Sequence, residues 1–292
     1  MDLRTSTATL MGTAIIMIKA AAFISPNKMR AQADGLTIGC SNPKSFSFRA
    51  AAARKPRQVD KIMQPVLKKT APFRLFQLIS PTLPVGAFAY SQGLEMAVEK
   101  QIVVDVDSSK TWLSGLIQNN LSFVDLPLLI RLQSGLHNQD AQIFSDWNDW
   151  LIAARETREL HLESTLMAQA LLRLLTSLSC TEDSRTIPDN LPKPLDWVSA
   201  FALACHLWQI EISDALAGFA WSWLENQVAA AIKLVPLGQT QGQRLLLELS
   251  TELETAITAA KSCSDDELGR MSPMQVMLSA QHETQYSRLF RS

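Results

Sequence analysis

The sequence predicts an all-α protein, a single-domain helical bundle of about eight to ten helices that follows a disordered N-terminal extension. Three observations favour this fold class. From Pro72 onward, apolar residues recur at the i, i+3, i+4, i+7 spacing of helices. No stretch has the period-two alternation of a strand, and no internal repeat is present. The composition, 47% hydrophobic and 19% charged, is typical of a globular protein.

Residues 1–65 are expected to lie outside the bundle, which leaves 66–292 as its domain. Residues 1–70 hold twelve Lys and Arg against three Asp and Glu, a net charge of +9, whereas residues 71–292 carry −10. Such a basic, Ala- and Ser-rich segment is typical of an organelle transit peptide. The alternative is a reading frame that starts too early, with Met63 as the native first residue. Both interpretations exclude the segment from the fold.

The expected helices are separated by prolines, glycines and polar capping residues. The first carries Phe73, Phe76 and Ile79, and it ends by Ser80 because Pro81 fixes φ and lacks an N–H. The apolar period predicts further helices over residues 112–124, 127–136, 143–154, 166–178, 195–210, 213–235 and 243–261. Residues 181–194 contain three prolines and no apolar period, so we expect a loop there.

The segment SPTLPVGAFAYSQGLE, residues 80–95, interrupts the helices with two prolines, two glycines and two aromatic residues. Gly86 permits a tight turn, Ser91 is expected to cap the next helix, and Glu95 falls in that helix's first turn. A bent segment with two aromatic residues is either a packed corner or a docking surface. The candidate partner-binding residues of this corner are Pro84, Gly86, Phe88, Tyr90, Ser91 and Glu95.

A second candidate surface is the charged run ARETREL, which the sequence places on a helix. Its candidate partner-binding residues are Arg155, Glu156, Arg158 and Glu159. Arg155 and Glu159 are spaced as an i,i+4 ion pair, worth about 0.3–0.5 kcal/mol. The run is either a solvated helix face, or a docking patch that could supply an arginine to a partner's nucleotide site.

The sequence contains no recognisable catalytic motif. The segment 236–244, PLGQTQGQR, lacks the GxxxxGK[ST] spacing of a phosphate-binding loop, so we expect only a corner between two helices there. Neither a GxSxG motif nor a local Ser/His/Asp or Cys/His arrangement is present. We therefore expect no enzyme, no catalytic residue and no tightly bound cofactor.

Metal binding within one chain is not expected either. The four histidines form no HExxH-like pair, and the four cysteines form no CxxC. A site shared across a symmetric dimer is the alternative, with His282 and Glu283 as its best candidates because an exposed tail could meet its symmetry mate. The cysteine usage indicates a reducing, cytoplasmic setting. A net charge of −1 and the lack of a long apolar run point to neither nucleic acid nor membrane as a partner.

The last eleven residues, HETQYSRLFRS, are the third candidate surface. Chain ends are usually polar, whereas this one carries a tyrosine, a phenylalanine and two arginines, the composition of an interface hot spot. It is either a final helix that packs on its own core or a tail that becomes ordered on a partner. Its candidate partner-binding residues are His282, Glu283, Tyr286, Ser287, Arg288, Leu289, Phe290, Arg291 and Ser292.

Four blocks of the chain, in order, carry a family resemblance. They are SPTLPVGAFAYSQGLE, ARETRELHLES, AAIKLVPLGQTQGQRLL and PMQVMLSAQHETQYSRLFRS. These blocks resemble the urease accessory protein F family, and the resemblance covers about residues 70–292. Residues 1–65 lie outside it.

The resemblance implies an all-α homodimer that acts as a scaffold. A protein of this family binds the urease accessory protein D/H, and the pair recruits the urease accessory GTPase G. The assembly then docks on apo-urease and couples GTP hydrolysis to nickel insertion, so nickel is handled by the assembly. By this resemblance the tail 286–292 contacts the D/H partner, and the other two surfaces lie on or beside protein–protein contacts. It assigns no role to residues 236–243.

Two other functions compete with the scaffold. The chain could activate the GTPase by inserting an arginine, with Arg155, Arg158 or Arg288 as the candidate. It could also be a stand-alone helical enzyme, which the missing motifs argue against.

Overall fold

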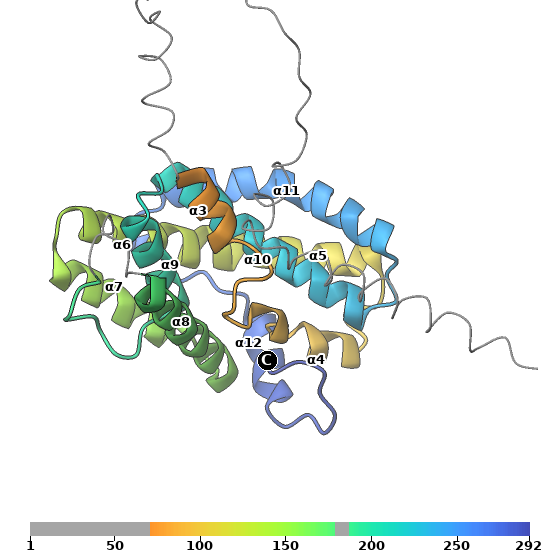
Figure 1. The fold of residues 1–292 in the computed structure, drawn as a ribbon. Helices are drawn as coiled ribbons and strands as arrows, with labels where there is room; N and C mark the ends of the chain where they lie inside the picture. Colours follow the sequence, from red (N-terminus) through yellow and green to blue (C-terminus); the bar gives the residue numbers. More distant parts are fainter. Residues whose placement is uncertain (1–70, 179–186) are drawn as a thin grey trace, which may run out of the picture. The chain divides into compact units, whose positions relative to one another are not determined.

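The computed structural model describes residues 71–178 and 187–292, all of which belong to one compact unit that spans 58–292. Within these ranges every regular element is helical, so the predicted all-α fold is confirmed (Figure 1). The expected extension, residues 1–65, lies outside the described residues, as does the 181–186 part of the expected loop. No helix in these two ranges has the length and hydropathy of a membrane span.

The helices follow closely the order that the apolar period predicted. They are α3 (Ala71–Leu78), α4 (Leu94–Glu99), α5 (Val106–Leu116), α6 (Leu126–His137), α7 (Ala141–Ala154), α8 (Arg158–Leu178), α9 (Trp197–Leu207), α10 (Ile212–Leu234), α11 (Gln239–Ser262) and α12 (Pro273–His282). A π-helical segment, Ile117–Asp125, joins α5 to α6, and short 3₁₀ turns lie at Ala87–Ala89 and Asp265–Glu267.

The core forms where α6, α9 and α10 meet. Helix α9 is buried along almost its whole length, which its nearly uninterrupted apolar sequence explains. The ring of Phe201 packs edge-on against Trp197 and against Phe219 of α10. Helices α10 and α11 lie side by side, and α8 packs on α9 (Figure 1).

Helix α3 covers α10 with its aliphatic side chains and leaves its aromatic rings outside. Leu75 and Ile79 pack over Gly218, where an added Cβ would lie 2.6 Å from Leu75 Cδ1. Phe73 and Phe76 are 74% and 60% exposed and pack edge to face on each other. The predicted end of this helix before Ser80 is confirmed.

Several helix starts differ from the predicted ones. Helices α5 and α8 begin at Val106 and Arg158, earlier than the predicted residues 112 and 166. The N-cap of α4 is Gly93 at φ +86°, and Ser91 instead accepts a weak hydrogen bond from Glu95 N at 3.3 Å. A Cβ on Gly93 would lie 3.2 Å from the carbonyl oxygen of Gln275, so glycine allows α4 and α12 to approach closely. Helix α11 begins at Gln239, because Gln241 folds back to accept the Gly238 N–H at 2.8 Å. The expected corner at 236–244 is therefore shorter than predicted.

Candidate functional site

The tail, residues 283–292, leaves α12 and folds back against α4, α8 and the corner 80–95. Phe290 is 6% exposed and Ser292 is fully buried. Arg291 N donates to the carbonyl oxygen of Ala89 at 2.8 Å, and the carbonyl oxygen of Ser292 accepts from Ser91 N at 2.6 Å. Of the two alternatives for this segment, the one in which it packs on its own core is confirmed, although as an irregular strap and not as a helix.

Glu95 of α4 is the main acceptor for the tail backbone. Its Oε1 accepts the N–H of Leu289 at 2.6 Å, and its Oε2 accepts the N–H of Phe290 at 2.8 Å. The same Oε2 lies 3.1 Å from Nε2 of His282. Glu95 is buried. It therefore holds the tail from inside, where its side chain has no exposed surface to offer a partner, and its partner-binding role stays a prediction.

His282 lies between two buried carboxylates. Its Nδ1 is 2.7 Å from Oε2 of Glu159, opposite the Nε2 contact to Glu95. The second oxygen of Glu159, Oε1, accepts Nη1 of Arg288 at 2.7 Å. An imidazole donates from both nitrogens only in its protonated form, so this geometry fits a positively charged ring.

The predicted exposure of His282 is wrong, because its side chain is fully buried. Neither ring nitrogen is open to a symmetry-related copy, since each already contacts a carboxylate. In the two described ranges, no three His, Cys, Asp or Glu side chains gather as metal ligands.

Arg155 is also not where the sequence placed it. Helix α7 ends at Ala154 and α8 begins at Arg158, so Arg155 caps α7 and turns inward. Its Nε donates to Asp196 Oδ2 and its Nη2 to Asp125 Oδ1, each at 2.9 Å. The predicted i,i+4 pair with Glu159 is wrong, as is the solvated-face interpretation for these two residues. The reason is the helix break, which points their side chains to different partners.

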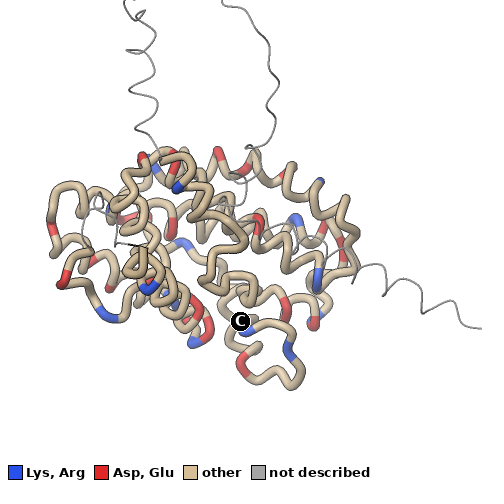
Figure 2. Tube along the Cα trace, viewed as in Figure 1, with Lys and Arg blue, Asp and Glu red and all other residues tan. Residues whose placement is uncertain are grey.

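The other two charged residues of the run remain at the surface. Glu156 and Arg158 are exposed. Figure 2 shows basic and acidic residues close together around the end of the chain, where α8, α4 and the tail meet. The charged run thus divides into an enclosed pair, Arg155 and Glu159, and an exposed pair, Glu156 and Arg158.

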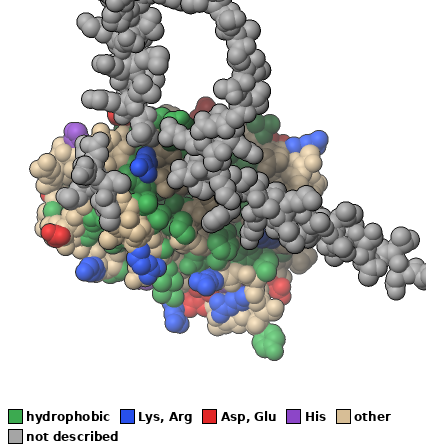
Figure 3. Space-filling model, viewed as in Figure 1, with side chains coloured by type: hydrophobic (Ala, Val, Ile, Leu, Met, Phe, Trp, Pro, Cys, Tyr) green, Lys and Arg blue, Asp and Glu red, His purple; other side chains and the backbone are tan. Residues whose placement is uncertain are grey.

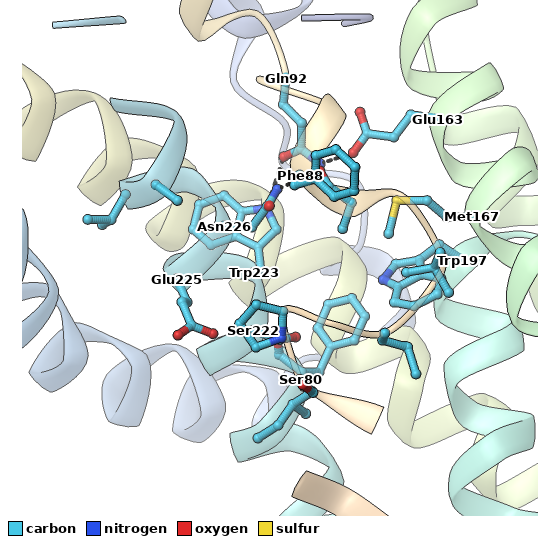
Figure 4. Close-up of a pocket in the computed structure, with 18 of the residues that line it drawn as sticks. Ser80, Phe88, Gln92, Glu163, Met167, Trp197, Ser222, Trp223, Glu225 and Asn226 are labelled. Atoms are coloured by element: carbon cyan, nitrogen blue, oxygen red, sulfur yellow. Dashed lines mark hydrogen bonds between the residues drawn. The ribbon is translucent and has the colours of Figure 1, made fainter. Parts of the chain in front are cut away.

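A second buried carboxylate of α8, Glu163, ties the end of the tail to the corner. Its Oε2 accepts the hydroxyl of Ser292 at 2.8 Å, and its Oε1 accepts Nε2 of Gln92 at 2.6 Å. Gln92 in turn accepts the indole N–H of Trp223 at 2.9 Å (Figure 4). Sequence reasoning missed Glu163 and Gln92. The spacing of Glu159 and Glu163 was the available signal, because two acids at i,i+4 repel unless each has a partner.

An apolar cavity of about 360 Å³ lies beside this hydrogen-bond chain, between the corner, α8 and α10. Phe88 from the corner and Trp223 from α10 lie close together in Figure 4, with Met167 and Trp197 on the α8 and α9 side. Phe88 is 64% exposed, whereas Tyr90 is buried. The packed-corner interpretation is therefore confirmed at Tyr90 and Ser91. Pro84 and Phe88 are exposed, and docking there stays a prediction.

The exposed side chains of the tail and of α8 form what we call the tail surface, defined as Arg158, Leu162, Leu166, Tyr286, Arg288, Leu289 and Arg291. Tyr286 is fully exposed and Leu289 is 66% exposed. A hollow of about 310 Å³ lies between α8 and the tail, lined in part by Leu162, Leu166 and Arg291. Figure 3 shows basic side chains beside hydrophobic ones on this part of the molecule. Exposed apolar groups with arginines beside them are typical of protein interfaces.

Glu163 makes stability depend on pH in a defined direction. Burial raises the pKa of Glu163 from 4.5 to about 7. The folded chain therefore holds this proton more tightly than the unfolded chain, and the stabilisation is lost as the pH rises from about 4.5 to about 7. We expect the free energy of unfolding of the wild-type chain, relative to E163Q, to fall by up to about 3 kcal/mol over that window.

Urea denaturation of both chains at about pH 5 and about pH 8 measures this difference. Glu156→Gln is the matched control, because Glu156 is an exposed carboxylate seven residues earlier in the sequence. Equal pH dependence in E163Q and wild type would contradict the assignment.

Comparison with known proteins places the chain in a family. A family model described as UreF matches residues 103–250. The chain is 48% identical over 218 residues to the urease accessory protein UreF of Psychrobacter cryohalolentis, covering 75% of this chain and 93% of that protein. It is 43% identical over 234 residues to the protein of that name from Alcanivorax borkumensis, covering 77% of this chain and all of that protein. The chain belongs to the UreF family.

The expected family resemblance is thereby confirmed. A third UreF protein, from Alkalilimnicola ehrlichii, is 46% identical over 219 residues, which cover 75% of this chain and 95% of that protein. These UreF relatives align over nearly their whole length.

Proposed function

We propose that this UreF-family chain is a non-catalytic urease maturation factor that captures other urease accessory proteins on its tail surface. The observation that supports this most directly is the combination of exposed Tyr286 and Leu289 with a backbone fixed underneath by Glu95. A surface that is ordered before binding loses less conformational entropy on association. The proposed role is therefore presentation of a preformed docking surface.

The finer assignment follows the family. In this proposal the tail surface binds the urease accessory protein D/H. The resulting pair recruits the urease accessory GTPase G in the cytoplasm. The chain works as a homodimer, and the assembly docks on apo-urease and couples GTP hydrolysis to nickel insertion. Nickel passes through the assembly as cargo, because a scaffold that bound it tightly would retain it.

The competing function is activation of the GTPase by an inserted arginine. The contacts of the three candidate arginines differ in how free each side chain is to reach a partner. Arg155 is enclosed between Asp125 and Asp196. Arg288 donates to Glu159 and to the carbonyl oxygen of Glu283. Arg158 is exposed beside the tail. Of the three arginines, it would therefore lose the fewest contacts within the chain on reaching a partner.

A double substitution tests the docking role. We expect Tyr286→Ala with Leu289→Ala to weaken binding of the D/H protein by about a hundredfold, because exposed aromatic and aliphatic anchors carry interface affinity. The melting temperature should stay unchanged, since both side chains are exposed. Isothermal titration calorimetry with the full chain measures the affinity.

Leu247→Ala is the matched control, a leucine of α11 that is 72% exposed and lies away from the tail in sequence. It should bind as wild type does. Wild-type affinity in the double variant would move the interface to another surface, such as the open part of the corner at Phe88. Lack of D/H binding by the wild-type chain would contradict the proposed function.

A further inference from the structure

The tail is held by a cluster of alternating charges centred on His282. Glu95 reaches the ring from α4 and Glu159 reaches it from α8, while the ring itself stands at the end of α12. The same two carboxylates bind the tail, Glu95 through the amides of Leu289 and Phe290 and Glu159 through Arg288. His282 is thus in direct contact with two of the groups that hold the tail in place.

The charge balance of this cluster depends on one proton. With a charged ring, two carboxylates face two cations, His282 and Arg288. With a neutral ring, the buried side chains carry an uncompensated negative charge, which is unfavourable where water is excluded. One ring nitrogen then also presents a lone pair to a carboxylate oxygen with no proton between them. Glu95 or Glu159 would lose its hydrogen bond at that point.

Among the described residues, Arg288 is the one cation besides His282 that forms an ion pair with Glu95 or Glu159. On α8 the next acid, Glu163, is bonded to Gln92 and Ser292. Arg158, Glu283 and Arg291 line the hollow beside Glu159, together with the buried Tyr90. Arg158 and Arg291 are exposed, so water screens their charges.

We propose that His282 is a proton-dependent latch that holds the tail surface in its docking arrangement. The protonated ring links α4, α8 and α12 to the tail. Loss of the proton to solvent weakens the hold of Glu95 and Glu159 on residues 283–292 and lowers affinity for the accessory partner. The inference rests on the proposed function of the tail surface and adds its regulation.

Glu163 acts in the same direction as the latch. Its raised pKa, about 7, means that it gains a negative charge beside Ser292 as the pH rises through neutrality. Deprotonation of His282 removes a positive charge and ionisation of Glu163 adds a negative one. Both make the net charge beneath the tail more negative. Experiments on the latch therefore use the E163Q background, which removes the ionisation of Glu163 from the measurement.

The latch is tested first in the isolated full-length chain. NMR follows the protonation of the His282 ring from about pH 5 to about pH 9, a range that covers ordinary histidine titration. Hydrogen exchange of the Leu289 and Phe290 amides, corrected for the intrinsic pH dependence of exchange, reports whether Glu95 still holds them. We expect their protection to fall about tenfold as the ring loses its proton.

Partner affinity is measured in parallel by calorimetry with the D/H protein. In the E163Q background we expect the affinity to fall about tenfold across the ring's own titration, equivalent to about 1.4 kcal/mol. The additional substitution His282→Gln, which is neutral at every pH, should bind weakly and with no such pH step. His137→Gln in the same background is the matched control, because His137 is exposed at the end of α6, and it should keep the pH profile of the E163Q parent.

Three results would overturn the latch. They are a ring that titrates with no change in amide protection, a ring that keeps one protonation state over the whole range, and a His282→Gln chain with the pH profile of its parent. The first two need no substitution at His282, so they hold even if His282→Gln fails to fold. If amide protection follows the ring but D/H never binds, the latch stands and the proposed function fails.

Discussion

Replacing Glu95 with alanine should lower the free energy of unfolding by about 3–5 kcal/mol, one of the two largest losses expected for a single substitution in this chain. The carboxylate accepts two tail amides and contacts His282, and all of these groups are buried or partly buried. Its removal leaves two N–H groups without an acceptor and a charged ring with one carboxylate in place of two. Each unpaired buried group costs about 1–3 kcal/mol.

The loss should appear first in the tail. Hydrogen exchange should show the Leu289 and Phe290 amides unprotected in E95A, and urea denaturation should show the fall in stability. Glu95→Gln keeps one acceptor oxygen and should lose about half as much. Glu99→Ala is the matched control, an exposed acid at the other end of α4, with an effect within about 0.5 kcal/mol. Retained amide protection in E95A would disprove the role of Glu95 as the tail acceptor.

The sequence predicted the helices well because their signal is local. Apolar spacing, prolines and glycines are all read within one or two turns of the chain. The main errors were at helix starts. Gly93 starts α4 where that helix approaches α12, and the Gln241 side chain starts α11 by accepting the Gly238 N–H, and residue type alone indicates neither contact. The importance of the tail was likewise visible in its aromatic and arginine content.

The connections of the site could not be predicted in the same way. His282 meets Glu159 and Glu95 across 123 and 187 residues, and Arg155 meets Asp196 across 41. Nothing in the local sequence distinguishes these charges from solvated ones, so composition alone favoured an exposed histidine and an exposed ion pair. The one local indication of these buried contacts was the i,i+4 spacing of Glu159 and Glu163 on α8. Two acids at that spacing repel each other unless each has a partner.

Replacing Arg155 with alanine should also lower the free energy of unfolding by about 3–5 kcal/mol. The substitution leaves Asp125 and Asp196 buried without their shared cation, and Asp196 is fully enclosed. Burial already raises the pKa of Asp125 in the wild-type chain, and loss of the arginine raises it further. The folded R155A chain therefore takes up a proton more readily than the unfolded one, so its deficit should shrink as the pH falls and grow as the pH rises.

Arg158→Ala separates this structural role from a role in a partner's nucleotide site. Arg158 is three residues away and exposed, so its loss should leave stability within about 0.5 kcal/mol of wild type. If R155A lowers the partner's rate of GTP hydrolysis, the fall should match the fraction of R155A chain that is unfolded. R158A leaves the chain folded, so a fall in the rate with R158A would mean that Arg158 itself contacts the partner's nucleotide site. A stable, fully folded R155A would contradict the buried Asp–Arg–Asp arrangement and return Arg155 to the list of arginines available to a partner.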